Sequence, residues 1–189
     1  MGKVYEKADD NVMAVMRDAL SRYHPELHAL GPRVGITMIT PNKDVENHPT
    51  APTVAINGQS CAATIRKVEP KERVQNNLDL EIKVDSYHWE KLSPAERLAL
   101  MDHELTHVEI VRGSDGQPKQ HDDTRPKLRL RPDEIYFTGF ASVIERHGSA
   151  ALEYQSLKNI NDKWGQQFFD WAEVKPSKRG AKHGLRAAV

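Results

Sequence analysis

The chain has 189 residues, and its 27 Lys and Arg balance its 27 Asp and Glu, so the formal net charge is zero. This balance gives the whole chain no electrostatic bias toward nucleic acid or an anionic membrane surface. Cys61 is the one cysteine, which excludes an intrachain disulfide. The polar N-terminus and the lack of a long apolar run predict a soluble, cytoplasmic protein with no membrane segment. The length favours a single domain, which we expect over residues 1–174.

The first part of the chain favours one helix and a set of strands. Residues 8–23 carry an apolar face at helical spacing, formed by Val12, Val15, Met16 and Leu20. Runs of residues that are typical of strands lie at 34–40, 52–56 and 62–68, and the charged segment 69–77 predicts an exposed loop. His24 and His28 are four residues apart, but Pro25 lies between them and interrupts a helix, so we expect both to be structural or exposed and not a pair of metal ligands.

The clearest strand covers residues 79–85. Leu80, Ile82 and Val84 alternate there with charged residues, which predicts one buried and one solvated face. Residues 86–92 then form a short connection, in which we expect Trp89 to pack under the start of the next helix.

A helix is predicted to begin at Ser93 and to end at Gly113. Ser93 is a typical N-cap, the proline that follows suits the first helical position, and Glu96 completes a capping box. An apolar stripe at helical spacing runs along this segment: Leu98, Met101, Leu105 and Val108. The stripe predicts that one face of the helix packs on the core.

This helix contains the sequence H-E-x-x-H, with His103, Glu104 and His107. Two histidines four residues apart lie on one face of a helix, where both imidazoles can bind one zinc ion. Glu104 lies beside them and could take a proton from a zinc-bound water. The alternative is a surface helix with two incidental histidines. The capping box and the core stripe favour the metal site.

The C-terminal third predicts two more helices and a basic end. Residues 125–131 alternate basic and apolar side chains, which predicts a short strand or extended arm whose basic face is either solvated or an anion contact. We expect one helix from Pro132 to Gly148, and a second over 152–172. Residues 175–189 hold five Lys or Arg and no acid, so we expect a disordered basic tail that is either a solubilising terminus or a weak nucleic-acid contact.

Three stretches carry a family resemblance: DLEIKVDSYHWEKLSPAERLALMDHELTHVE, then RPKLRLR, then GFASVIERHG. They resemble the putative phage metallopeptidase family of phages and prophages and, more distantly, the SprT-like zinc proteases. The resemblance implies an α+β, minimal zincin-like fold, in which a small mixed sheet and flanking helices surround the H-E-x-x-H helix. It implies a zinc peptidase with His103 and His107 as metal ligands and Glu104 as general base. In such folds a sheet edge binds the substrate backbone, and either 79–85 or 62–68 could supply it.

The third metal ligand is open at this stage. A catalytic zinc usually has three protein ligands, and the pattern that places a third histidine shortly after H-E-x-x-H fails here, because Gly113 stands at that position. Similar phage proteins carry His-Asp where this chain has Asp133 and Glu134, so the resemblance favours Asp133. His121 is the second choice and Glu134 the third.

Catalysis also needs a group that stabilises the oxyanion, for which Tyr136, His147 and Arg125 are candidates. The predicted partner is a protein or peptide substrate in the cytoplasm of the host cell. Two other functions fit the sequence. One is a SprT-like, DNA-associated protease that acts near nucleic acid, with 125–131 and the tail as DNA contacts. The other is a non-catalytic zincin-fold module that binds a host protein.

Overall fold

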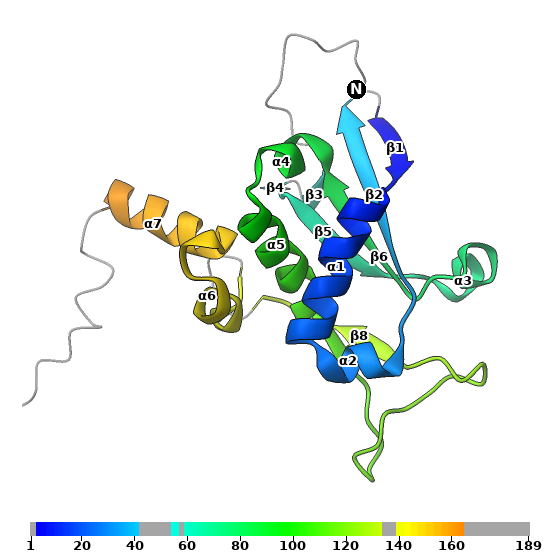
Figure 1. Ribbon diagram of the computed structural model, residues 1–189. Helices are drawn as coiled ribbons and strands as arrows, with labels where there is room; N and C mark the ends of the chain where they lie inside the picture. Colours follow the sequence, from blue (N-terminus) through cyan, green and yellow to red (C-terminus); the bar gives the residue numbers. More distant parts are fainter. Residues whose placement is uncertain (1–2, 42–53, 57–58, 134–138, 165–189) are drawn as a thin grey trace, which may run out of the picture.

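The fold is built on a mixed four-stranded sheet with the strand order β1-β2-β6-β5 (Figure 1). The structure is a computed structural model and describes residues 3–41, 54–56, 59–133 and 139–164. The four strands are β1 (Lys3–Lys7), β2 (Val34–Pro41), β5 (Ala63–Lys67) and β6 (Leu80–Asp85). Two short hairpins accompany them: β3 (Ala55–Ile56) with β4 (Gln59–Ser60), and β7 (Val108–Ile110) with β8 (Leu128–Leu130). The α+β class is confirmed.

Strand β6 lies in the interior of the sheet. It runs parallel to β2 and antiparallel to β5, and its side chains Leu80, Ile82 and Val84 are 0% exposed. The strands expected at 34–40, 62–68 and 79–85 are therefore confirmed. Two segments are candidates for the sheet edge that binds substrate, 62–68 and 79–85. Only 62–68 lies at an edge of the sheet, because β6 has a partner strand on each side.

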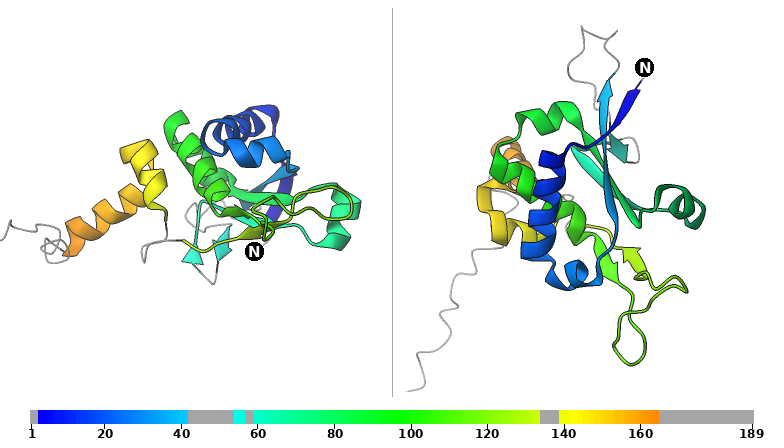
Figure 2. Two further views of the ribbon diagram at one scale, coloured as in Figure 1. Left: turned by 90° about the horizontal axis from the view of Figure 1, so that it is seen from below. Right: turned by 45° about the vertical axis from the view of Figure 1, so that its right-hand side comes forward.

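Helices α1 (Asp10–Tyr23) and α5 (Pro94–Thr106) pack against each other on one face of this sheet (Figure 2). Asp9 caps α1 by accepting a hydrogen bond from the backbone N–H of Val12. The apolar faces of both helices meet the inward side chains of β2 and β6 in one core. Its helical members include Val12, Met16, Leu20, Leu100, Met101 and Leu105. The core fixes the position of α5, and with it the H-E-x-x-H sequence.

Helix α5 begins as predicted and ends earlier than predicted. The capping box of Ser93 and Glu96 is present, but the helix stops at Thr106 with His107 as its C-cap. The expected continuation to Gly113 is wrong, because Val108–Ile110 forms strand β7 and pairs with β8. The backbone N–H of Arg131 donates to the carbonyl of His107, which closes the pairing at the helix end.

Three short helices connect these elements: α2 (Pro25–Leu30), α3 (Pro70–Asn76) and α4 (Ser86–Lys91). The loop expected at 69–77 is wrong. Glu69 and Glu72 form a capping box there, and Asn77 ends the helix in the left-handed conformation at φ 57°. The connection expected at 86–92 is also a helix for most of its length, because residues 86–91 form α4. Trp89 in this helix is buried beside the start of α5, as predicted.

The C-terminal part of the described chain lies beside α5. It consists of α6 (Ala141–His147), the 3₁₀ helix η2 (Gly148–Ala150) and α7 (Leu152–Trp164), and each contacts α5 (Figure 1). The helix expected from Pro132 begins only at Ala141, because Pro132, Asp133 and Gly139 are not helical, so the predicted start is wrong. Glu134, Tyr136, residues 165–172 and the tail lie outside the described residues. No helix in the described part of the chain is long and apolar enough to cross a membrane.

Candidate metal centre

The last turn of α5 holds the two histidines of the motif side by side. His103 lies in the final turn, and His107 is the C-cap residue. Their ring centroids are 5.0 Å apart and their planes are nearly perpendicular. Met101 and Leu105 on the opposite face are fully buried against the core, so the imidazoles face away from it. The helix therefore presents both rings on the side away from the core, toward Asp133 and Phe140.

Asp133 completes a group of three ligand atoms. Its Oδ1 lies 3.8 Å from His103 Nε2 and 3.6 Å from His107 Nε2. One ligand atom from each of these residues lies within 4.8 Å of the other two. Ligand atoms about 2.05 Å from a tetrahedral zinc ion are about 3.3 Å apart. The two distances from Asp133 are therefore close to the separation that one zinc ion requires.

Two buried oxygen atoms beside the histidines have no hydrogen-bond partner among the described residues: Asp133 Oδ1 and Glu104 Oε2. Buried polar atoms are nearly always paired in folded proteins, so two unpaired carboxylate oxygens at one place need an explanation. A cation between the imidazoles and Asp133 supplies one, because it would bind Oδ1 directly. The donor set of two imidazoles and a carboxylate also suits zinc. The residues present fit the metal.

The far nitrogen of each imidazole is already engaged. His107 Nδ1 lies 2.8 Å from the backbone carbonyl of Arg131, and His103 Nδ1 lies 2.5 Å from Glu153 Oε1. A carbonyl can only accept, so the His107 ring donates from Nδ1. The Nε2 atom of a neutral His107 ring then has a free lone pair on the side of Asp133.

A buried aromatic ring supports the pair. Phe140 is 0% exposed, and its ring centroid lies 5.3 Å from that of His103 and 4.8 Å from that of His107. The guanidinium of Arg131 lies 4.8 Å from the centre of the Phe140 ring, and its Nε donates to the Thr106 carbonyl at the end of α5. The Phe140 ring thus packs against both imidazoles and leaves them little room to rotate.

Burial changes the protonation of the motif residues. It raises the pKa of the Glu104 carboxyl to about 7, although the charge of nearby His103 opposes the rise. The backbone of Ile65 on β5 also hydrogen-bonds Glu104, which ties this side chain to the sheet edge. Burial lowers the pKa of His107, which keeps its ring neutral as a metal ligand must be. Burial would lower the pKa of His103 too, but the hydrogen bond to Glu153 and the charge of Glu104 raise it.

The other candidates from the sequence lie elsewhere or outside the described residues. His121 is exposed and lines a different surface cavity of about 410 Å³ with Arg73 and Arg125. Arg125 pairs with buried Asp79 at 3.3 Å, and Arg129 pairs with Glu109 at 2.5 Å. Much of the basic face of 125–131 is therefore used within the molecule.

A buried carboxylate next to the motif was missed by the sequence reasoning. Asp102 is 0% exposed and accepts hydrogen bonds from His24 and His147, each at 2.8 Å, and from two nitrogens of Arg146. It thereby ties α5 to the residue between α1 and α2 and to α6. The structural role expected for His24 is confirmed, and His147 contacts Asp102 in the same way.

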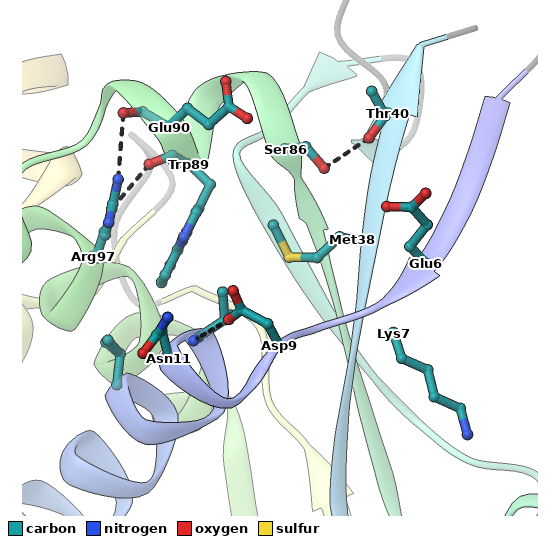
Figure 3. A pocket seen from close by; sticks show the side chains of 12 residues that line it. Glu6, Lys7, Asp9, Asn11, Met38, Thr40, Ser86, Trp89, Glu90 and Arg97 are labelled. Atoms are coloured by element: carbon teal, nitrogen blue, oxygen red, sulfur yellow. Dashed lines mark hydrogen bonds between the residues drawn. The ribbon is translucent and has the colours of Figure 1, made fainter.

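A second cavity, of about 490 Å³, lies between the end of β1, the start of α1, the end of β2 and helix α4 (Figure 3). Its lining includes none of the motif residues, nor Asp133. Several polar groups in it bond to the protein itself. Thr40 donates to Ser86, and Arg97 donates to the carbonyls of Trp89 and Glu90 (Figure 3). This cavity offers no group of converging ligand atoms.

Comparison with known proteins gives one result. Searches of curated proteins and of solved structures found no match. A family model described as putative phage metallopeptidase matches residues 17–164, which include α5, Asp133 and α7. Because this match spans well over half of the sequence, the chain belongs to the putative phage metallopeptidase family.

Proposed function

We propose that this protein is a zinc-dependent peptidase whose metal is held by His103, His107 and Asp133. The observation that carries the proposal is the convergence of two histidines and one carboxylate at the end of α5, where Asp133 Oδ1 lies 3.8 and 3.6 Å from the two Nε2 atoms. The family supports a metal-dependent hydrolase acting on peptide bonds. Two histidines and a carboxylate form a ligand set used by catalytic zinc sites, which keep one position open for water or substrate.

The residues of the chain have distinct tasks in this reaction. A zinc ion held by His103, His107 and Asp133 would supply a water molecule with a lowered pKa and would polarise the carbonyl of the peptide bond. Glu104 takes the proton of the attacking water at its unpaired Oε2 and passes it to the leaving amine. The contact with Ile65 holds the other end of this carboxylate in place while the proton moves. Burial favours proton exchange, because it brings the pKa of Glu104 near neutrality.

The proposal is tested by zinc content and peptidase activity of the same preparations. We expect about one zinc per chain both in the wild type and in Glu104→Gln. The wild type should hydrolyse peptides, whereas Glu104→Gln should not. His107→Ala and Asp133→Ala should both lose zinc. His121→Ala is the matched control, because His121 is a histidine away from the cluster, and it should keep both properties. Wild-type protein that binds no zinc after reconstitution would sink the proposal.

Glu104→Gln also separates the proposed enzyme from a non-catalytic module that acts by binding a host protein. A binding module would keep its function in this variant, because the substitution changes one buried atom and leaves the surface intact. A peptidase would lose it.

A further inference from the structure

The side chain of Glu153, in the first turn of α7, is buried beside the metal centre. Its exposed fraction is 4%, and its Oε1 lies 2.5 Å from His103 Nδ1. A buried carboxylate is costly unless it is paired. Among the described residues, the hydrogen-bond partner of this carboxylate is the His103 ring. The pairing joins α7 to α5 across 50 residues of sequence.

The contact is on the far side of the ring from the ligand atoms. Asp133 approaches His103 at Nε2, whereas Glu153 approaches at Nδ1. Glu153 therefore cannot be a further ligand of the same ion through this arrangement. An ionised carboxylate only accepts, so the ring must donate from Nδ1. In a neutral ring this leaves the Nε2 lone pair free.

The chain makes room for this side chain at Gly139. A Cβ atom at position 139 would lie 2.1 Å from Glu153 Cγ and 2.9 Å from Glu153 Cβ. Neither distance is compatible with a side chain at 139 unless Glu153 moves. The absence of a side chain at this position thus permits the contact between Glu153 and His103.

The two histidines are held by different acceptors. His107 Nδ1 meets the neutral carbonyl of Arg131, whereas His103 Nδ1 meets a carboxylate. A carboxylate on the far nitrogen makes an imidazole a stronger electron donor to a metal than a carbonyl does. His103 should therefore depend on its partner more strongly than a histidine held by the main chain.

We propose that Glu153 is a positioning residue, which holds His103 in the tautomer that binds metal through Nε2 and strengthens that bond with its charge. This inference rests on the proposed function, since it takes His103 as a metal ligand. It assigns the first turn of α7 to the metal centre.

The test measures zinc affinity by competition with a chromogenic chelator in Glu153→Gln and Glu153→Met. Gln keeps a hydrogen-bond acceptor and loses the charge, whereas Met has about the same length and loses both. We expect affinity to fall about 10-fold for Gln and about 100-fold for Met, with one zinc still bound at saturation. Glu145→Gln removes an exposed carboxylate on α6 and should leave the affinity unchanged. Affinities within twofold of the wild type in both Glu153 variants would overturn the inference.

A second measurement needs neither metal nor a stable variant. The ring tautomer of His103 in metal-free wild-type protein can be read from ¹⁵N chemical shifts at alkaline pH. We expect the proton on Nδ1, and a proton on Nε2 would overturn the inference. Failure of the proposed function looks different: wild-type protein would then bind no zinc, or His107→Ala would keep it. If His107→Ala loses zinc while the Glu153 variants bind it normally, the inference alone has failed.

Discussion

At the residue scale, the charge of Asp102 is stabilised by three donor residues from two separate parts of the chain: His24, and the neighbours Arg146 and His147 on α6. Burial alone would raise the pKa of this carboxyl, but hydrogen bonds from His24, Arg146 and His147 lower it to about 2. A folded-state pKa below the unfolded value stabilises the protein above the unfolded value, near 3.8. That contribution, about 2 kcal/mol, should be lost as pH falls from about 4 to about 2.

This predicts how Asp102→Asn changes with pH. The free energy of unfolding of the metal-free variant should be lower than that of the wild type at pH 7, and the difference should shrink as pH falls below 4. Denaturant unfolding at a series of pH values measures it. Asp18→Asn removes an exposed aspartate that pairs with Arg22, so it should have little effect at any pH. A difference for Asp102→Asn that stays constant down to pH 2 would contradict this account.

At the element scale, the two ends of α5 have different tasks. The capping box of Ser93 stabilises the start of the helix, whereas the β7–β8 hairpin holds its end, where His107 lies. Ser93→Ala should lower the free energy of unfolding by about 1 kcal/mol without changing zinc affinity. Leu128→Ala removes a buried side chain of β8 and should cost about 3 kcal/mol.

Unlike Ser93→Ala, Leu128→Ala should also weaken zinc binding, because the Arg131 carbonyl that orients His107 follows β8 directly. Thermal unfolding and chelator competition on the same samples give both quantities. Equal zinc affinities in the two variants would show that the hairpin does not position His107.

The elements that sequence predicted best are those defined by neighbours along the chain. The H-E-x-x-H helix has its own capping box and apolar stripe, and β6 has a strict alternation. The start of α3 carries a comparable local signal in Glu69 and Glu72, which could have been recognised. The end of α5 could not be placed in the same way, because β7 forms only by pairing with a strand about twenty residues later.

Contacts between distant parts of the chain escaped prediction at the site too. Glu153 is one buried glutamate 50 residues after His103, and no local pattern distinguishes it from other glutamates. The same holds for the partners of Asp102, which come from both sides of it in sequence. Asp133 was found only through the family resemblance, and the structure brings it to the two histidines.

At the scale of the whole molecule, the sheet, α1 and α5 form one core, and the candidate metal centre lies at its border with α6 and α7. The basic residues 175–189 follow this body in sequence. We predict that a chain ending at residue 174 keeps its zinc affinity and peptidase activity but loses weak retention on immobilised DNA at low salt. Retention by the full-length chain should fall steeply as salt is raised. Equal retention of both chains would remove the tail as a nucleic-acid contact.

The spread of the site along the sequence has a consequence for synthesis. The side chains that meet there run from His103 on α5 through Asp133 to Glu153 on α7. A ribosome-bound chain that has exposed only α1 and α5 has formed much of its core, yet it offers a metal two imidazoles and no carboxylate from Asp133. The centre is therefore assembled late, after translation has passed the last of these residues. If the centre is the peptidase site proposed above, cleavage would become possible only after residue 153 has been made, which would spare the growing chain and its neighbours until then.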